Sequence, residues 1–249
     1  MATALITGAT SGIGSAFAEE LARQGHNIVL VARDTVALAK IAQQVRGQGV
    51  EAEILAADLA DPDQLNVVAA RLADAARPID ICVNNAGLGV REDFATSSVA
   101  EEQLMIDVMV TAVMRLSHAV LPVMLNRGTG AIINVSSIAG WLPGGTYSAA
   151  KAWTTVFSES LHAKVEPQGV HVIAVCPGYT RTQFHQRAGM NMSKVPSWMW
   201  LTPEQVVSEA LKDARSGRVW SVAGRLYKGL GFAARVLPNA ITRRVMAGR

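Results

Sequence analysis

The sequence has few cysteines, histidines and charged residues, and each scarcity narrows the class of protein. Only two of its 249 residues are cysteine. Because Cys82 and Cys176 lie in apolar segments, neither a disulfide scaffold nor a thiolate metal site is expected. The five histidines have no ligand spacing, so no metal site is predicted. Charged residues make up 17% of the chain and no segment is repetitive, which argues against disordered and solenoid architectures.

The sequence also lacks long apolar runs, and it has no acidic residue after residue 213. No run of about 18 apolar residues occurs, as a membrane span would require, and no basic leader precedes the first apolar stretch. We therefore expect a cytoplasmic protein. All 20 acidic residues lie in residues 1–213, whereas residues 214–249 carry eight bases and no acid. No nucleic-acid-binding motif accompanies this basic tail, so a nucleic-acid partner is not expected.

What the sequence has instead is a regular alternation of apolar, strand-like runs with segments of helical periodicity. Half of the residues are hydrophobic, which is enough for the core of one domain over residues 1–249. The alternation predicts an α/β fold, namely a Rossmann-type doubly wound parallel sheet with helices on both faces. The ligand site of such a sheet lies at the carboxyl ends of its strands. The predicted strands are residues 3–7, 27–31, 53–57, 79–83, 130–135, 170–175 and 218–222.

A glycine-rich turn follows the first predicted strand and opens a helix. It reads Thr-Gly-Ala-Thr-Ser-Gly-Ile-Gly over residues 7–14. Glycine permits the unusual backbone angles of such a turn and lets a pyrophosphate approach the N–H groups at the positive end of the helix. A purely structural turn is the alternative, but strand, turn and helix are all in place. The candidate cofactor residues are Gly8, Thr10, Ser11, Gly12, Ile13 and Gly14.

More polar residues follow the later strands, at the same edge of the predicted sheet. Arg33 ends the second strand, where an acidic residue would bind the ribose 2′-hydroxyl of NAD and an arginine can pair with the 2′-phosphate of NADP. NADP is therefore favoured over NAD. The alternative is a solvated Arg33 with the neighbouring Asp34 turned inward. After the third and fourth strands come two further candidate groups, Asp58-Leu59 and Asn84-Asn85-Ala86-Gly87, which alone could be a helix cap and a turn.

Tyr147 and Lys151 stand four residues apart at the start of a predicted long helix, after a strand that ends in Ser136-Ser137. Residues at this spacing share a helix face, so the Lys151 ammonium is expected to favour the phenolate and to lower the pKa of Tyr147. A phenol with a pKa of about 10 needs this help to exchange protons at neutral pH. A tyrosine and a lysine one turn apart more often lie on an exposed helix face than form a catalytic pair. The catalytic role of Tyr147 and Lys151 is therefore inferred from the surrounding motifs.

The motifs T-G-x-x-x-G-x-G, N-N-A-G, Y-x-x-x-K and Pro-Gly-Tyr-Thr-Arg-Thr occur in this order and together resemble the short-chain dehydrogenase/reductase family over about the first 215 residues. The resemblance implies an NAD(P)-dependent oxidoreductase that interconverts a carbonyl and a secondary alcohol by hydride transfer. Tyr147 would be the general acid/base, Lys151 its pKa modifier and a ribose ligand, and Ser137 a hydrogen-bond donor to the carbonyl oxygen. The remaining implied roles are adenine contact for Asp58 and Leu59, cofactor binding for Asn85, Ala86 and Gly87, and nicotinamide contact for Pro177, Gly178, Thr180 and Thr182.

Two features depart from the family pattern. Met109 stands where members usually have an asparagine that is thought to hold a water of the proton relay, and a methionine cannot donate a hydrogen bond. Either another polar group holds this water, or the relay is impaired, or the protein is a non-catalytic dinucleotide-binding sensor or scaffold. The connection from Ser137 to Tyr147 is also shorter than most members carry, so a differently shaped substrate mouth is expected.

Two segments lie outside the motifs. Residues 183–201 form a candidate substrate lid, and its methionines and tryptophans favour an apolar ketone or secondary alcohol, although packing on the protein itself or on a subunit is the alternative. Residues 224–249 form a basic amphipathic tail with apolar residues from Leu226 to Leu237 at helical spacing. This tail could contact an anionic membrane surface, with packing on a subunit as the alternative. By family analogy we expect a homodimer or homotetramer through helices near residues 101–125 and 147–166.

Overall fold

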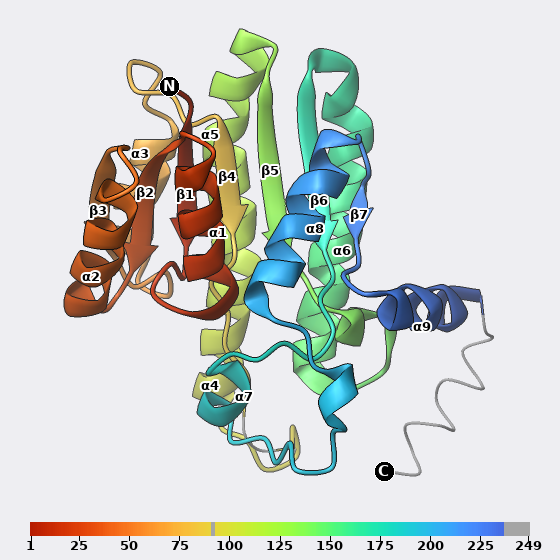
Figure 1. Ribbon diagram of the computed structural model, residues 1–249. Coiled ribbons are helices and arrows are strands. Elements are labelled where there is room, and N and C mark those ends of the chain that lie inside the picture. The colour runs from red at the N-terminus through yellow and green to blue at the C-terminus, as the bar shows by residue number, and fades with distance from the viewer. Residues whose placement is uncertain (91–92, 237–249) are drawn as a thin grey trace.

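The computed structural model describes residues 1–90 and 93–236. Its centre is one parallel sheet with the strand order β3-β2-β1-β4-β5-β6-β7 and helices on both faces (Figure 1). The predicted doubly wound fold is therefore confirmed. The strands are β1 (Thr3–Thr7), β2 (Asn27–Ala32), β3 (Ala52–Ala56), β4 (Ile81–Asn84), β5 (Gly130–Val135), β6 (Val170–Val175) and β7 (Trp220–Ser221).

The strand order reverses direction between β1 and β4, and this reversal positions the site. From β1 the chain continues outward to β2 and β3, and it then returns to place β4 on the other side of β1. In open parallel sheets a crevice forms at such a reversal, outside the carboxyl ends of the strands. The glycine-rich turn after β1 and the Asn-Asn-Ala-Gly segment after β4 therefore meet at the crevice.

The helices form two layers over separate hydrophobic clusters. On one face lie α1 (Gly12–Arg23), α2 (Thr35–Arg46) and α8 (Pro203–Arg215), and on the other lie α3 (Pro62–Leu72), α5 (Ala112–Arg127) and α6 (Gly145–Val165). Three of these helices begin at side-chain caps, because Asp34, Asp61 and Thr202 each accept a hydrogen bond from a first-turn amide. The remaining α-helices in the described residues are α4 (Val99–Ile106), α7 (Phe184–Arg187) and α9 (Arg225–Val236).

A continuous helical stretch from Val99 to Arg127 is more apolar than the sequence inspection led us to expect. It comprises α4, the π-helical turn Asp107–Thr111 and α5. Within the described residues, it is the one helix long and apolar enough to cross a membrane by length and composition, and an 18-residue window of it has a mean hydropathy of 1.7. Leu116, Val120 and Met124 are buried in the cluster between this helix and the sheet. In this structure the stretch is therefore a core layer of the domain.

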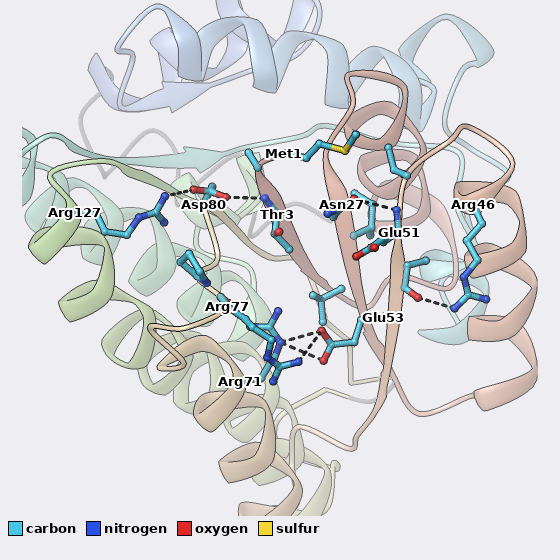
Figure 2. Close-up of a pocket in the computed structure, with 16 residues that line it drawn as sticks. Met1, Thr3, Asn27, Arg46, Glu51, Glu53, Arg71, Arg77, Asp80 and Arg127 are labelled. Carbon is cyan, nitrogen blue, oxygen red and sulfur yellow. Dashed lines mark hydrogen bonds and ion pairs between the residues drawn. The ribbon is translucent and has the colours of Figure 1, made fainter.

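A charged cleft of about 890 Å³ lies at the amino-terminal edge of the sheet, away from the motif residues (Figure 2). Arg71 Nε lies 3.0 Å from a carboxylate oxygen of Glu53 in β3. Asp80 accepts from Arg127 Nη2 at 2.6 Å and from the Thr3 amide at 2.7 Å. These ion pairs and the hydrogen bond from Thr3 connect β1 and β3 to the helices α3 and α5. We therefore interpret the charged residues of the cleft as structural.

Candidate active site

The glycine-rich turn is too closely packed for side chains at its glycine positions. Gly8 and Gly12 have φ angles of +65° and +58°, in the left-handed region that favours glycine. A Cβ atom on Gly14 would lie 2.2 Å from the carbonyl oxygen of Gly8, and one on Gly12 would lie 2.8 Å from Thr182 Cγ2. The turn therefore forms a cradle lined by backbone.

The first turn of α1 brings polar N–H groups to this cradle. The helix begins at Gly12, its N-cap Ser11 makes no side-chain capping bond, and no acidic residue lies in the first turn. Amides at a helix amino terminus lack intrahelical partners and carry partial positive charge, so they favour an anion. The residues present fit the pyrophosphate of a dinucleotide. The predicted residues Thr10 and Ile13 are half-buried in the same turn.

Thr7 joins the two halves of the cofactor crevice, and the sequence analysis did not single it out. Its hydroxyl accepts hydrogen bonds from the amides of Asn85 and Ala86 at 2.9 and 3.0 Å and donates to the carbonyl of Val83. The Asn85 side chain in turn donates to the carbonyls of Thr7 and Gly8. The signal was available, because Thr7 is the first residue of the glycine motif.

The charged residues at the ends of β2 and β3 are arranged in one small group. Arg33 is 69% exposed, and its guanidinium lies 3.5 Å from the Asp58 carboxylate. Asp34 caps α2 by accepting from the Ala37 amide at 2.9 Å, so it is not turned into the crevice. Asp58 does not cap α3, since Asp61 has that role. The Leu59 side chain is buried in the hydrophobic core.

Tyr147 and Lys151 lie in the first two turns of α6. Lys151 Nζ is 5.8 Å from the centre of the Tyr147 ring and donates a hydrogen bond of 2.7 Å to the carbonyl of Val135. Burial raises the pKa of Tyr147 to about 12, with a smaller opposing effect from a hydrogen bond to the Ser137 side chain. Burial also lowers the pKa of Lys151 to about 8.

These directions correct the expectation that Lys151 lowers the pKa of Tyr147. The ammonium group is directed to the Val135 carbonyl, and the cost of burying a phenolate outweighs its hydrogen bond. Without a bound cofactor, Tyr147 is therefore a neutral phenol at physiological pH, while Lys151 is mostly protonated. This pair suits the donation of a proton to a substrate oxygen.

Ser137 is held beside Tyr147 by the turn that follows β5. Its hydroxyl accepts from the Ala139 amide at 3.1 Å and caps the short helical turn Ile138–Trp141. This turn rests closely on α6, because a Cβ atom on Gly140 would lie 2.7 Å from the Ala152 amide nitrogen. The structure thus brings the three predicted catalytic residues, Ser137, Tyr147 and Lys151, together at the carboxyl end of β5.

Met109 lies beside the same group, in the π-helical turn between α4 and α5. It is 1% exposed and packs with Met105, Val108 and Ala150 in a small apolar cluster against which Tyr147 also packs. A Cβ atom on Gly87 would lie 3.9 Å from both Met109 Cγ and Lys151 Nζ. Met109 and the Lys151 ammonium therefore both border the space beside Gly87. π-Helical turns are often found at functional sites.

A buried polar network supports the site from below, and the sequence analysis missed it. The Asn84 side-chain amide donates to Ser117 Oγ at 3.1 Å and to Asn134 Oδ1 at 2.8 Å, and Asn134 donates to Ser158 Oγ at 2.9 Å. The four residues come from β4, α5, β5 and α6. Nothing in the local sequence marks them as partners, since they are 24 to 50 residues apart along the network bonds.

The predicted nicotinamide residues lie in the loop after β6. Thr182 reaches the glycine turn at Gly12, whereas the buried Thr180 donates to the carbonyl of Gly178 at 3.0 Å. The carbonyl of Pro177 accepts from the Ile138 amide, which links this loop to the Ser137 turn. A cavity of about 600 Å³ lies between the loop and α1, lined by Ser11, Gly12, Ser15, Arg181, Thr182, Gln183, Trp200, Pro203 and Glu204.

The candidate lid covers Tyr147. Phe184 of α7 packs on the Tyr147 ring at a centroid distance of 5.6 Å. A Cβ atom on Gly89 would lie 3.1 Å from Ala188 Cβ and 3.5 Å from Phe184, so glycine at this position lets the lid lie close to the loop after β4. The lid side chains Met190 and Trp198 remain 40% and 70% exposed.

Known proteins that are similar to this chain agree with the site described above. The model of the short chain dehydrogenase family matches residues 2–192. The ketoacyl reductase HetN of Nostoc sp. strain PCC 7120 is 34% identical over 180 residues, which are 71% of this chain and 63% of that protein. The chain thus spans slightly less than two thirds of the length of this relative.

Two solved structures are similar over nearly the whole chain. A short-chain dehydrogenase from Sphingobium yanoikuyae in complex with NADPH is 36% identical, with a TM-score of 0.86 and 94% of each chain covered. A bulky-bulky ketone specific alcohol dehydrogenase from Comamonas testosteroni is 31% identical, with a TM-score of 0.82 and coverage of 94% of this chain and 92% of that one.

The sheet, the glycine cradle and the Ser137, Tyr147 and Lys151 group together define a dinucleotide-binding oxidoreductase. This chain belongs to the short-chain dehydrogenase/reductase family. Members of the family bind NAD(P) and act on small-molecule carbonyl or alcohol substrates.

Proposed function

We propose that this protein is an NADPH-dependent reductase of bulky, apolar ketones. The observation that carries the proposal is the state of Tyr147, whose phenol is kept neutral by burial beside Ser137 and beneath Phe184. A neutral phenol is ready to protonate a carbonyl oxygen, whereas alcohol oxidation would need its conjugate base.

Tyr147, Ser137 and Lys151 each have a separate role in the proposed reduction. The bound nicotinamide would supply the hydride to the carbonyl carbon. Tyr147 gives its proton to the carbonyl oxygen, and the Ser137 hydroxyl donates a hydrogen bond to the same oxygen. Lys151 carries its proton at neutral pH because its pKa is about 8. Its ammonium, 5.8 Å from the centre of the Tyr147 ring, would bind the ribose of the cofactor and would stabilise the negative charge left on Tyr147.

The preference for NADPH rests on Arg33. Its contact with Asp58 is exposed, and exposed ion pairs are worth about 0–1 kcal/mol, so a 2′-phosphate can replace it. Asp34 is engaged as a helix cap, and a similar structure was solved with NADPH. We expect Arg33→Ala to reduce kcat/KM for NADPH about ten- to a hundredfold while changing that for NADH little, because one charged hydrogen-bonding partner is lost. An equal effect on both cofactors would refute this assignment.

The proposed substrate class rests on the lid. Phe184 packs on Tyr147, and Met190 and Trp198 are exposed apolar residues of the same lid. Two similar proteins are named for a bulky-bulky ketone and for ketoacyl groups. We expect higher kcat/KM for bulky apolar ketones, including long-chain 3-oxoacyl thioesters, than for small polar ones. Faster turnover of the small polar ketones would contradict this substrate class.

The test of the catalytic proposal compares Tyr147→Phe with the unchanged protein. NADPH oxidation with an active ketone should stop in Tyr147→Phe, while NADPH binding, measured by fluorescence titration, should persist. Ser137→Ala should lower kcat about a hundredfold or more, as is typical when a donor to a developing oxyanion is removed. If the unchanged protein and Tyr147→Phe showed the same background rate, the non-catalytic sensor alternative would be favoured.

We further propose a homodimer through the helices α4, α5 and α6. Leu104, Met114 and Val156 are exposed apolar residues, one on each of these helices, and we expect the partner subunit to cover them. We expect Val156→Glu to shift the protein toward the monomer in light-scattering chromatography. An unchanged mass would place the interface elsewhere.

The predicted contact of the basic tail with a membrane also remains a proposal. In α9, Leu226 and Leu230 are exposed beside Arg225 and Lys228, although Lys228 forms an ion pair with Glu209. The predicted apolar residue Leu237 lies outside the described residues. Co-sedimentation with anionic vesicles should decrease when residues 224–249 are removed, and equal partitioning of both proteins would refute the contact.

A further inference from the structure

Tyr227 of α9 makes contacts that neither the motifs nor the proposed chemistry require. It is 1% exposed, although it lies on a short helix near the protein surface. Its hydroxyl donates to the carbonyl of Met199 at 2.6 Å and accepts from the amide of Tyr179 at 3.2 Å. These two partners are 20 residues apart in sequence. Tyr179 precedes the lid by four residues and Met199 lies near its last residue, and we call these two places the ends of the lid.

The ends of the lid already pair with each other at this point. Leu201 donates to the carbonyl of Tyr179 at 2.8 Å, and Arg181 donates to the carbonyl of Leu201 at 2.9 Å. Thr180 and Leu201 thereby form an isolated parallel bridge. The Tyr227 hydroxyl extends this bridge by one further link, which comes from a third segment of the chain.

The ring of Tyr227 is fitted against the nicotinamide loop. A Cβ atom on Gly178 would lie 2.2 Å from Tyr227 Cζ, so only glycine leaves room for the ring. Gly224, with a φ angle of +82°, lets the chain turn into α9 just before the helix begins. The helix has a second anchor, because a Cβ atom on Gly231 would lie 2.3 Å from the Trp141 ring. The helix α9 therefore contacts both the loop after β6 and the turn after Ser137.

A chain of aromatic contacts connects the ends of the lid to the catalytic residue. Tyr179 packs on Trp200 and His185 at centroid distances of 5.8 and 6.0 Å. His185 contacts Phe184 at 5.6 Å, and Phe184 contacts Tyr147 at 5.6 Å. These packed rings form a continuous path from Tyr179 to Phe184, which lies on the Tyr147 ring.

We propose that Tyr227 is a positioning residue that hydrogen-bonds to both ends of the lid and so holds Phe184 over the substrate pocket. The catalytic consequence of this inference rests on the proposed ketone reduction. The hydroxyl satisfies a donor at one end of the lid and an acceptor at the other, and the buried ring fixes where the hydroxyl lies. The helix α9 is then the clasp of the lid.

Tyr227→Phe tests the proposal because it removes the hydroxyl and keeps the ring. Trypsin cleavage after the exposed Lys194 within the lid, followed by mass spectrometry, reports lid opening without any need for turnover. We expect cleavage at this bond to accelerate about tenfold, because two partly buried hydrogen-bonding groups lose their partner. The control Leu230→Ala alters the exposed side of the same helix and should leave cleavage unchanged.

In steady-state kinetics, Tyr227→Phe should affect KM and kcat to different extents. In Tyr227→Phe, the KM of a bulky ketone should rise about ten- to a hundredfold, while kcat at saturation and the KM of a small ketone change less than about threefold, as expected when substrate binding rather than chemistry is weakened. Thermal unfolding of both variants should match that of the unchanged protein within a few degrees. Equal loss for all ketones together with a large fall in Tm would mean a merely structural role and would overturn the proposal.

The outcomes separate this inference from the proposed function. If the unchanged protein reduces ketones but Tyr227→Phe has normal cleavage and normal KM, the clasp is refuted and the reductase stands. If the unchanged protein reduces no ketone but Tyr227→Phe is cleaved faster at Lys194, the clasp is supported and the proposed reaction fails.

Discussion

The protonation of Lys151 should set the alkaline limit of ketone reduction. Burial lowers the pKa of this ammonium to about 8, whereas Tyr147, with a pKa of about 12, keeps its proton over the whole working range. With a pKa of about 8, the charged fraction is about 90% at pH 7 and about 10% at pH 9. We therefore expect kcat/KM to be level below about pH 7 and to fall about tenfold for each unit above pH 8.

The assay measures kcat/KM for NADPH at saturating ketone, because this parameter reports the pKa values of the free enzyme. Lys151→Arg retains the charge at all these pH values, so its activity, although lower, should show no alkaline limb near pH 8. Lys164→Arg, at the exposed far end of α6, is the matched control and should keep the original profile. A level profile up to pH 10 in the unchanged protein, or the same limb in Lys151→Arg, would refute the reasoning.

Three further substitutions test other parts of the site. Gly14→Ala should abolish NADPH binding in a fluorescence titration, because its Cβ would meet the Gly8 carbonyl, whereas Gly229→Ala, with nothing within 4 Å, should not affect binding. Asn134→Leu should lower the free energy of unfolding in urea by about 2–4 kcal/mol, because it leaves buried partners of the polar network unpaired; a loss below about 0.5 kcal/mol would contradict this. Met109→Leu should cost less than about 1.5 kcal/mol of stability and leave kcat unchanged, since Met109 contributes packing alone, so slower turnover at equal stability would reveal a direct role.

The sequence predicted the sheet well because apolar runs and their spacing are local signals. The bounds of β1, β5 and β6 agree with the expected residues, whereas β4 begins two residues later than predicted, at Ile81. The edge strand β7 is only two residues long, Trp220–Ser221, where residues 218–222 were predicted. Strand ends depend on which partner a neighbouring strand offers, and that information is not contained in the local pattern.

The positions of the site residues that lie in motifs were predictable from the sequence. Properties that depend on the surrounding structure, such as a pKa or a capping role, were not. The positions of Ser137, Tyr147 and Lys151 at the carboxyl end of β5 follow from the motif order. The pKa of Tyr147 does not, because it depends on how deeply the ring is buried and on the direction of the Lys151 ammonium. The role of Asp34 as a helix cap likewise became apparent only from the geometry at the start of α2.

The connection after Ser137 and the carboxyl-terminal helix α9 meet in space. The connection contains Trp141, and α9 contains Gly231, whose missing side chain leaves room for the Trp141 ring. The helix α9 thus packs on the turn after Ser137 at Gly231 and on the loop after β6 through Tyr227, whose hydroxyl also bonds to the carbonyl of Met199. The proposed fastening of the lid therefore depends on an element that no catalytic motif contains.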